Sequence, residues 1–153
     1  DLITKQGNLE GGIYHLTLAE RFGPLDHTAI GLREGARAYI TGASFWELDW
    51  RQTLTYFAEV SAGWPSLWDG TMTASQRYFI ASMRYGDELF LRQEYCAANE
   101  QYQNASAMGA LEAGSAKNAN EAFQQCYPPT AIIEPTAIAT IEATPTETPT
   151  VVP

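Results

Sequence analysis

Cys96 and Cys126 are the side chains of this chain best suited to covalent chemistry, and it has no other cysteine. Their spacing matches no metal-ligand pattern, and only His15 and His27 could add imidazole ligands. Two interpretations stay open: a disulfide, if the protein is exported, or two buried free thiols. We favour the disulfide, because the last part of the chain has the composition of an extracellular segment.

The other side chains that could carry chemistry do not form a recognisable catalytic site. Neither histidine has a distinctive context, so no Ser-His-Asp arrangement is indicated, and the sequence has no glycine-rich phosphate loop. Asp87, Glu88 and Glu94 suit helix caps or a solvated face. Residues 69–71 (Asp-Gly-Thr) have too few oxygen ligands for a calcium loop and are interpreted as a turn. We therefore predict no enzyme activity, no metal and no cofactor.

Length and charge limit the partners of the chain. Its 153 residues suit one domain and a tail, and an apolar fraction of 45% is ample for a core. Nine basic and 18 acidic residues give a net charge of −9. Nucleic acids and anionic membrane surfaces repel an acidic protein, so we expect neither as a partner. No apolar run approaches the length of a membrane span.

Three segments align without gaps: residues 7–24, 48–65 and 93–110. Each opens with a polar residue able to cap a helix and then places apolar, small or aromatic side chains 3, 4 and 3 residues apart. This spacing puts them on one helical stripe, where large and small side chains interlock with a neighbouring helix. The expected caps are Asn8, Asp49 and Glu94. The expected packing positions are Leu9, Leu16, Ala19, Trp50, Phe57, Val60, Tyr95, Ala98, Tyr102 and Ala105.

Further helical patterns lie between these segments. Residues 27–46 and 73–91 carry apolar side chains at helical spacing, and the second begins with a capping-box pattern of Thr and Gln. Residues 115–126 indicate one more helix, and residues 1–7 could supply only the last turn of another. Helix pairs repeated along the chain predict an all-α fold of about six helices, arranged as an α-solenoid.

The last of these units resembles a tetratricopeptide repeat. The matching residues are Gly86 in its first helix and Tyr95, Ala98, Tyr102 and Ala105 in its second. The repeat offsets, 41 residues from Leu9 to Trp50 and 45 from Trp50 to Tyr95, exceed the usual 34, which implies longer first helices or longer turns. The resemblance covers roughly residues 1–127. It implies a right-handed solenoid whose first helices line a groove for extended peptides.

Residues 128–153 form a tail of different composition. Residues 130–153 contain seven Thr and four Pro, which favour extended backbone. One interpretation is a solvated stalk or linker, O-glycosylated at Thr144, Thr146, Thr148 and Thr150. The other is a strap that docks its apolar side chains in a groove. Those side chains are Ile132, Ile133, Ile138, Ile141, Val151 and Val152. Trp64 and Trp68, beside a proline-containing turn, are further interface candidates.

These features predict a structural protein outside the cell or on the cell surface of a prokaryote. We expect it to be a filament subunit that joins copies of itself head to tail through residues 128–153. The alternative is an adaptor or scaffold of the tetratricopeptide type that binds a peptide of another protein. The chain begins at Asp1 without a signal peptide, so we expect processing or a longer precursor. The C-terminal end of the repeats looks capped, and we expect an upstream segment or another subunit to cover the N-terminal end.

Overall fold

The computed structural model describes residues 1–128, and helices account for most of them. In chain order they are α1 (Leu2–Gln6), α2 (Leu9–Ala19), α3 (His27–Ser44), α4 (Trp50–Gly63), α5 (Ala74–Leu91), α6 (Tyr95–Ser106) and α7 (Ala113–Cys126). The described part contains no strand, only an isolated bridge between Trp68 and Thr73. The all-α prediction is therefore confirmed for residues 1–128. The helix beyond the six expected is the short α1.

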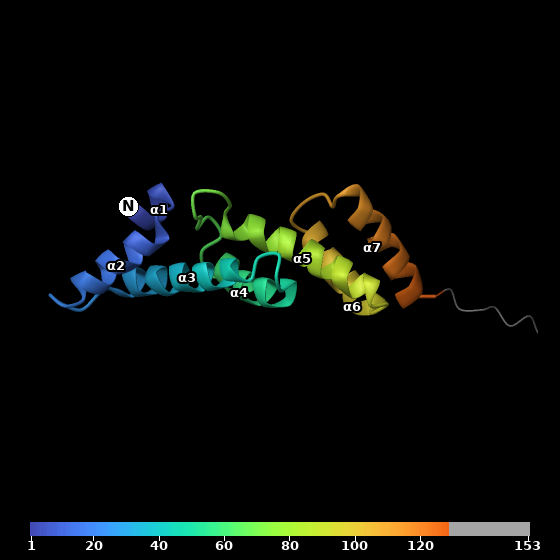
Figure 1. Ribbon diagram of the computed structural model, residues 1–153, viewed down its shortest axis with the longest axis horizontal. Coiled ribbons are helices and arrows are strands. Elements are labelled where there is room, and N and C mark those ends of the chain that lie inside the picture. Colours follow the sequence, from blue (N-terminus) through green and yellow to red (C-terminus); the bar gives the residue numbers. More distant parts are fainter. Residues whose placement is uncertain (129–153) are drawn as a thin grey trace, which may run out of the picture.

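The helices lie side by side in a row. Each packs on the helix that follows it, and α5 also contacts α7. Figure 1 shows α1, α2 and α3 at one end of the row and α7 at the other. The buried apolar side chains form two clusters, one around α1 to α4 and the start of α5, and a second around α5, α6 and α7. Each helix is therefore held mainly by its contacts with the adjacent helices of the row.

Capping side chains set the starts of three expected helices. Asn8 and Asp49 each accept a hydrogen bond of 2.9 Å from the backbone N–H three residues later. Thr73 and Gln76 form the predicted capping box at the start of α5. Such a cap stabilises a helix by about 1 kcal/mol. Glu94 occupies the N-cap position of α6, as expected, but its side chain makes no cap hydrogen bond.

Within each pair of long helices, a glycine of the first helix receives an aromatic ring of the second. A Cβ on Gly86 of α5 would lie 2.9 Å from the Tyr102 ring of α6. A Cβ on Gly42 of α3 would lie 3.0 Å from the Phe57 ring of α4. Both rings are almost fully buried. A side chain at either glycine would hold the two helices apart, which explains why glycine occupies both positions.

Most of the expected packing positions face the interior. Leu9, Phe57, Val60, Gly86, Ala98, Tyr102 and Ala105 are buried, and Leu16, Trp50 and Tyr95 are half-buried. Ala19 is exposed, so the expectation that it packs was wrong. Since α1 has five residues and its Ile3 lies against Gly12, it covers the start of α2 and does not reach Ala19.

The extra length of the repeats lies in two places. Helices α3 and α5 have 18 residues each, and residues 64–73 form a long connection between α4 and α5. This connection crosses to α1, where Gly7 lies against Gly70: a Cβ on Gly7 would be 2.5 Å from the Gly70 nitrogen. Gly7 also has a positive φ of 66°, so its position requires glycine for both reasons.

A buried arginine ties this connection to the helices. Arg77 of α5 donates hydrogen bonds to the Tyr39 hydroxyl (2.8 Å) and to Asp69 Oδ2 (2.5 Å), and the Tyr39 hydroxyl donates to the Met72 carbonyl. Asp69 Oδ1 also accepts from the N–H groups of Thr71 and Met72, which confirms the predicted turn. Burial alone would raise the pKa of Asp69, but a hydrogen bond from the Thr71 hydroxyl (2.6 Å), together with those from the two N–H groups and Arg77, holds it well below its usual range.

Asp87 joins α5 to the last two helices. Its carboxylate accepts hydrogen bonds from the Tyr102 hydroxyl of α6 (2.8 Å) and from Ser115 (2.8 Å) and Asn118 (3.2 Å) of α7. Burial, together with the hydrogen bond to Asp87, raises the pKa of Tyr102 above its usual value. The expectation of a cap or solvated face for Asp87 was therefore wrong, because the side chain turns inward between three helices.

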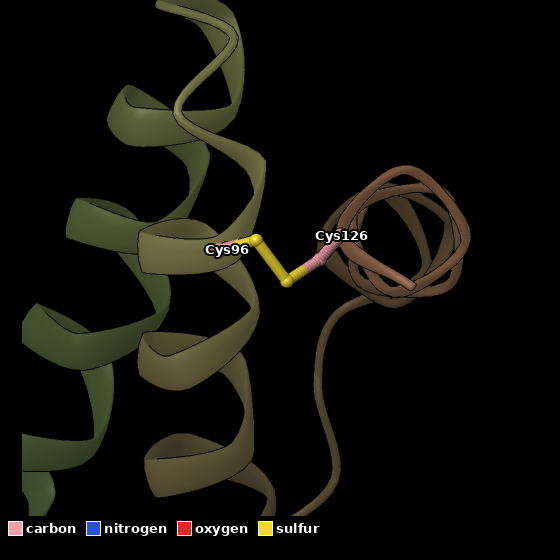
Figure 2. Close-up of a disulfide and its surroundings, with 2 residues drawn as sticks. All are labelled: Cys96 and Cys126. Atoms are coloured by element: carbon pink, nitrogen blue, oxygen red, sulfur yellow. A yellow bond between two sulfur atoms is a disulfide. The ribbon is translucent and has the colours of Figure 1, made fainter. Parts of the chain in front are cut away.

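A disulfide joins the same two helices. Cys96 of α6 and Cys126 of α7 are bonded, with their Cα atoms 4.8 Å apart. Figure 2 shows the sulfur–sulfur bond bridging the space between the start of α6 and the end of α7. Cys96 is exposed and Cys126 is half-buried. The two cysteines are therefore not the buried free thiols of the other interpretation.

Candidate protein-interaction surface

An apolar hollow lies at the α1 end of the row. It has a volume of about 280 Å³. Its lining comes from α1, α3 and the chain that ends α4, and consists of Thr4, Leu32, Gly63, Trp64, Pro65, Ser66 and Leu67. Trp64 can enter this space because Gly35 of α3 has no side chain: a Cβ there would lie 2.6 Å from Trp64 Cδ1. The Trp64 indole therefore packs against α3 at a position without a side chain, and in this way it forms part of the wall of the hollow.

A second apolar hollow is also lined by residues of α1. Its volume is about 220 Å³. It is lined by Asp1, Leu2, Ile3, Gly12, His15, Leu16 and Leu32. The two hollows share Leu32 and each is lined by residues of α1, so we describe them together as the N-terminal furrow, defined by these two sets of residues.

The lining of the N-terminal furrow decides what it can bind. Aliphatic side chains and one indole make up most of it, and Asp1 and His15 are its only ionisable side chains. Such a surface suits proline rings and branched aliphatic side chains, which stack on an indole or fill apolar hollows. It holds no set of polar groups that would orient a charged small molecule. The furrow is therefore suited to an extended, apolar peptide.

The predicted interface residues fall in different places. Trp64 is half-buried and lines the furrow. Trp68 is also half-buried, but it lies in the 64–73 connection and does not line the furrow. The tail positions lie outside the described residues, as does all of the predicted tail except Pro128. These positions are Ile132, Ile133, Ile138, Ile141, Val151 and Val152 and the possible glycan sites Thr144, Thr146, Thr148 and Thr150.

Sequence reasoning missed two exposed apolar groups. Tyr14, Leu18 and Phe22 of α2 and its following turn are 64%, 36% and 87% exposed, and Phe123 and Tyr127 at the end of α7 are 51% and 59% exposed. The signal that could have found the first group is its spacing of four residues on a helix face away from the packing stripe. The second group shows the same spacing.

Two further features concern metal-binding groups and membrane-spanning helices. In residues 1–128, no three or more His, Cys, Asp or Glu side chains are grouped so that they could hold a metal ion. In the same part of the chain, no helix combines the length and the apolar character needed to cross a membrane.

Comparison with known proteins identifies no relative. No family model, no curated protein and no solved structure matches the chain. Function is therefore argued from the furrow, the exposed apolar groups and the composition of the chain alone.

Proposed function

We propose that this protein is an extracellular structural subunit that assembles by binding residues 129–153 of one copy in the N-terminal furrow of the next. The observation that carries the proposal is the furrow itself, an apolar surface of the right character beside α1. Residues 129–153 supply matching chemistry, since they combine prolines with isoleucines and valines and contain no basic residue.

We further propose that the helices form a right-handed solenoid of the tetratricopeptide type. Two features support this arrangement. Each helix packs on its successor, and the contact of Gly86 with Tyr102 is repeated by Gly42 with Phe57 one pair earlier. In such a solenoid an extended peptide lies along the first helices, and both α1 and α3, which line the furrow, are first helices of their pairs.

The end of the described chain and the furrow lie at positions that allow the proposed contact to repeat from one copy to the next. The described chain ends just after α7, and the furrow lies at the opposite end of the row (Figure 1). A segment that leaves one end and binds the other end of a second copy makes a head-to-tail contact. Head-to-tail contacts build rings or fibres.

Export is supported by the disulfide between Cys96 and Cys126. Disulfides persist in oxidising compartments and are rare where glutathione keeps thiols reduced. A mass spectrum of the protein purified from its native source, before and after reduction, tests this part of the proposal. We expect the intact chain to gain two hydrogens only on reduction. Free thiols in the native protein would contradict it.

The assembly is tested by comparing the full chain with residues 1–128 by light scattering over a wide concentration range. We expect the full chain to grow into larger species as concentration rises, and residues 1–128 to remain monomeric. A full chain that stays monomeric would contradict self-assembly. Residues 129–153 are long enough to fold back, since 25 extended residues reach at most about 90 Å, and a monomer would fit that closed form or an adaptor for a foreign peptide.

The furrow is tested separately with a synthetic peptide of residues 129–153. We expect it to bind the 1–128 protein and to change the fluorescence of the furrow indole, Trp64. A Leu2→Asp variant should weaken this binding, whereas the control Leu48→Asp should not. Leu48 is a suitable control because it is 83% exposed and lies in the turn between α3 and α4, away from the furrow. Equal binding by both variants would place the peptide elsewhere.

A further inference from the structure

The outer face of α2 carries an apolar strip that the furrow does not use. Its members are Tyr14, Leu18 and Phe22, and we name them the outer α2 strip. They are 64%, 36% and 87% exposed, and none of them lines either hollow of the furrow. Their spacing of four residues sets them in one ridge that continues from α2 into the following turn.

The other repeats show that this strip is not part of the repeat pattern. The alignment places Thr55 of α4 and Glu100 of α6 at the position of Tyr14. It places Glu59 of α4 and Asn104 of α6 at the position of Leu18, and all four of these polar side chains are exposed.

These two positions are therefore polar and solvated in the second and third units, whereas Gly63 and Met108, which is 42% exposed, lie at the position of Phe22. Apolar side chains on a solvated face add nothing to the fold, and exposed apolar groups of this kind mark interaction sites. The outer α2 strip therefore needs a function that the repeat itself does not explain.

A matching pair lies at the opposite end of the molecule. Phe123 and Tyr127 are 51% and 59% exposed, and their ring centroids are 5.2 Å apart. The α7 side chains that pack inward, Ser115 and Ala122, are buried. The aromatic pair at the end of α7 is therefore not part of this buried face, and about half of each ring is exposed.

We propose that the outer α2 strip of one copy packs against Phe123 and Tyr127 of a second copy. This inference rests on the proposed self-assembly and adds a contact between folded helices that does not involve residues 129–153. Tyr14 and Leu18 lie four residues apart on α2 and Phe123 lies in the last turn of α7, and helix ridges of residues four apart interlock when two helices cross at about 50°. The two groups lie at opposite ends of the row (Figure 1), so one contact leaves a free group at each end for the next copy.

The position at which the described chain ends supports a second copy as the partner of the outer α2 strip. Pro128 follows Tyr127 directly, so the described chain ends beside the aromatic pair. With that pair on the outer α2 strip, the segment of residues 129–153 begins at the end of the second copy that carries the N-terminal furrow. Aromatic side chains bury about 150–250 Å² each, while a stable interface buries about 800 Å² per partner. The helix contact is therefore too small alone and needs the segment beside it.

Two full-length variants test the contact, Phe22→Glu and Phe123→Lys. Every helix contact needs one intact α2 strip and one intact α7 pair, so in either variant alone each contact between copies lacks one of these two groups. We expect the association constant of each to fall at least roughly thirtyfold, as for a central interface aromatic. Leu48→Glu is the control, because Leu48 is 83% exposed, close to the exposure of Phe22. Circular dichroism should give all three variants the wild-type thermal midpoint, since the substituted side chains are exposed.

Mixing the two variants in equal amounts gives the decisive result. A Phe22→Glu chain keeps its α7 pair and a Phe123→Lys chain keeps its α2 strip, so we expect 1:1 dimers joined by one intact contact to be the main species in sedimentation velocity. A mixture that stays monomeric would overturn the inference. Phe123→Lys chains that alone form dimers and nothing larger would also overturn it, because a closed dimer would mean that α2 strips pair with each other.

The remaining outcomes separate this inference from the proposed function. If both variants assemble as the wild type does, the helix contact is wrong and docking through residues 129–153 stands. If the wild type itself never associates, the contact and the proposed function fail together.

Discussion

Asp87 is the residue on which the last three helices depend. Its carboxylate accepts hydrogen bonds from one side chain of α6 and two of α7, and its side chain is only 23% exposed. Hydrogen bonds to a charged acceptor are stronger than those between neutral groups, and a donor left unpaired in the interior is costly. The neighbouring Glu88 lies instead on the surface, where it forms an ion pair with Arg92.

Replacing Asp87 by Ala should lower the free energy of unfolding by about 3 kcal/mol, because three donors lose one charged acceptor. Glu88→Ala is the matched control and should cost less than about 0.5 kcal/mol, as surface ion pairs do. Urea denaturation followed by circular dichroism measures both values. Equal losses in the two variants would show that Asp87 does not join the helices.

Asp69 should make the fold sensitive to acid. Its pKa is lowered in the folded protein, so its contribution to stability is complete above the unfolded pKa of about 3.9 and is lost as pH falls below that value. Asp69→Asn removes this titration. Measured from pH 7 to pH 2, the free energy of unfolding should fall less steeply in the variant, which starts lower at pH 7. Parallel curves below pH 4 would contradict the assignment.

The structural roles of some of these residues could be predicted from the sequence, and those of others could not. Asn8, Asp49 and Thr73 were predicted correctly as caps because a cap acts on backbone only three residues away. Asp87 was misjudged because its partners on α7 lie 28 and 31 residues later in the chain. Arg77 was not singled out, since nothing in its local sequence shows that it is buried against Tyr39 and Asp69.

At the scale of the helix, close packing depends on glycine at the points where a ring crosses. A Cβ at Gly86 would lie 2.9 Å and 3.0 Å from two atoms of the Tyr102 ring, and Tyr102 is 1% exposed. A ring held in a full interior cannot move aside without disturbing its neighbours. Gly114 in α7 provides the comparison, because no atom lies within 4 Å of the position of its Cβ.

Gly86→Ala should therefore destabilise the protein by about 1–3 kcal/mol, the usual cost of overpacking. Gly114→Ala should stabilise it by about 0.5 kcal/mol, because alanine favours the helix and meets open space. Thermal denaturation of the two variants separates the effects by sign. If Gly86→Ala also stabilised the protein, the ring contact would not limit how closely α5 and α6 approach.

Reduction of the disulfide should release α7 before the rest of the fold. The bond closes a segment of 30 residues, for which the chain-entropy estimate is about 3.6 kcal/mol. We expect a dithiol reductant to lower the free energy of unfolding by about 2–4 kcal/mol, with faster amide exchange in α7 and little change in α3. A Cys96→Ala, Cys126→Ala variant should match the reduced protein and show no response to the reductant, and an undiminished stability would contradict this role.

The order and type of the helices followed from the sequence, and details of their contacts did not. The stripes in residues 48–65 and 93–110 predicted the inward faces of α4 and α6, because the 3.6-residue period is a local property. Ala19 shares that pattern and is nevertheless exposed, because the short α1 does not cover it. The crossing of residues 64–73 to Gly7 could not be inferred, since it joins segments whose pairing no local signal records.

At the scale of the whole molecule, apolar surface at the two ends opposes the charge of the chain. A net charge of −9 makes copies repel one another at low salt. The furrow, the outer α2 strip and the aromatic pair of α7 must together outweigh that repulsion if copies are to associate. Salt screens the repulsion and leaves apolar contacts intact, so assembly of this kind grows stronger as salt is added.

The furrow was only partly predictable. Trp64 was selected from the sequence because it lies beside a turn-forming proline, and it lines the furrow. Leu32 and Gly35 were not selected, although Leu32 lines both hollows and Gly35 makes room for the indole. Their importance arises from the way α1, α3 and the end of α4 meet, which depends on tertiary contacts between distant segments.

Sedimentation velocity of the full chain, at rising protein concentration and at physiological salt, tests self-assembly most directly. We predict a weight-average sedimentation coefficient that increases with concentration and falls to the monomer value when residues 129–153 are removed. A full chain that sediments as a monomer at every concentration would contradict head-to-tail assembly.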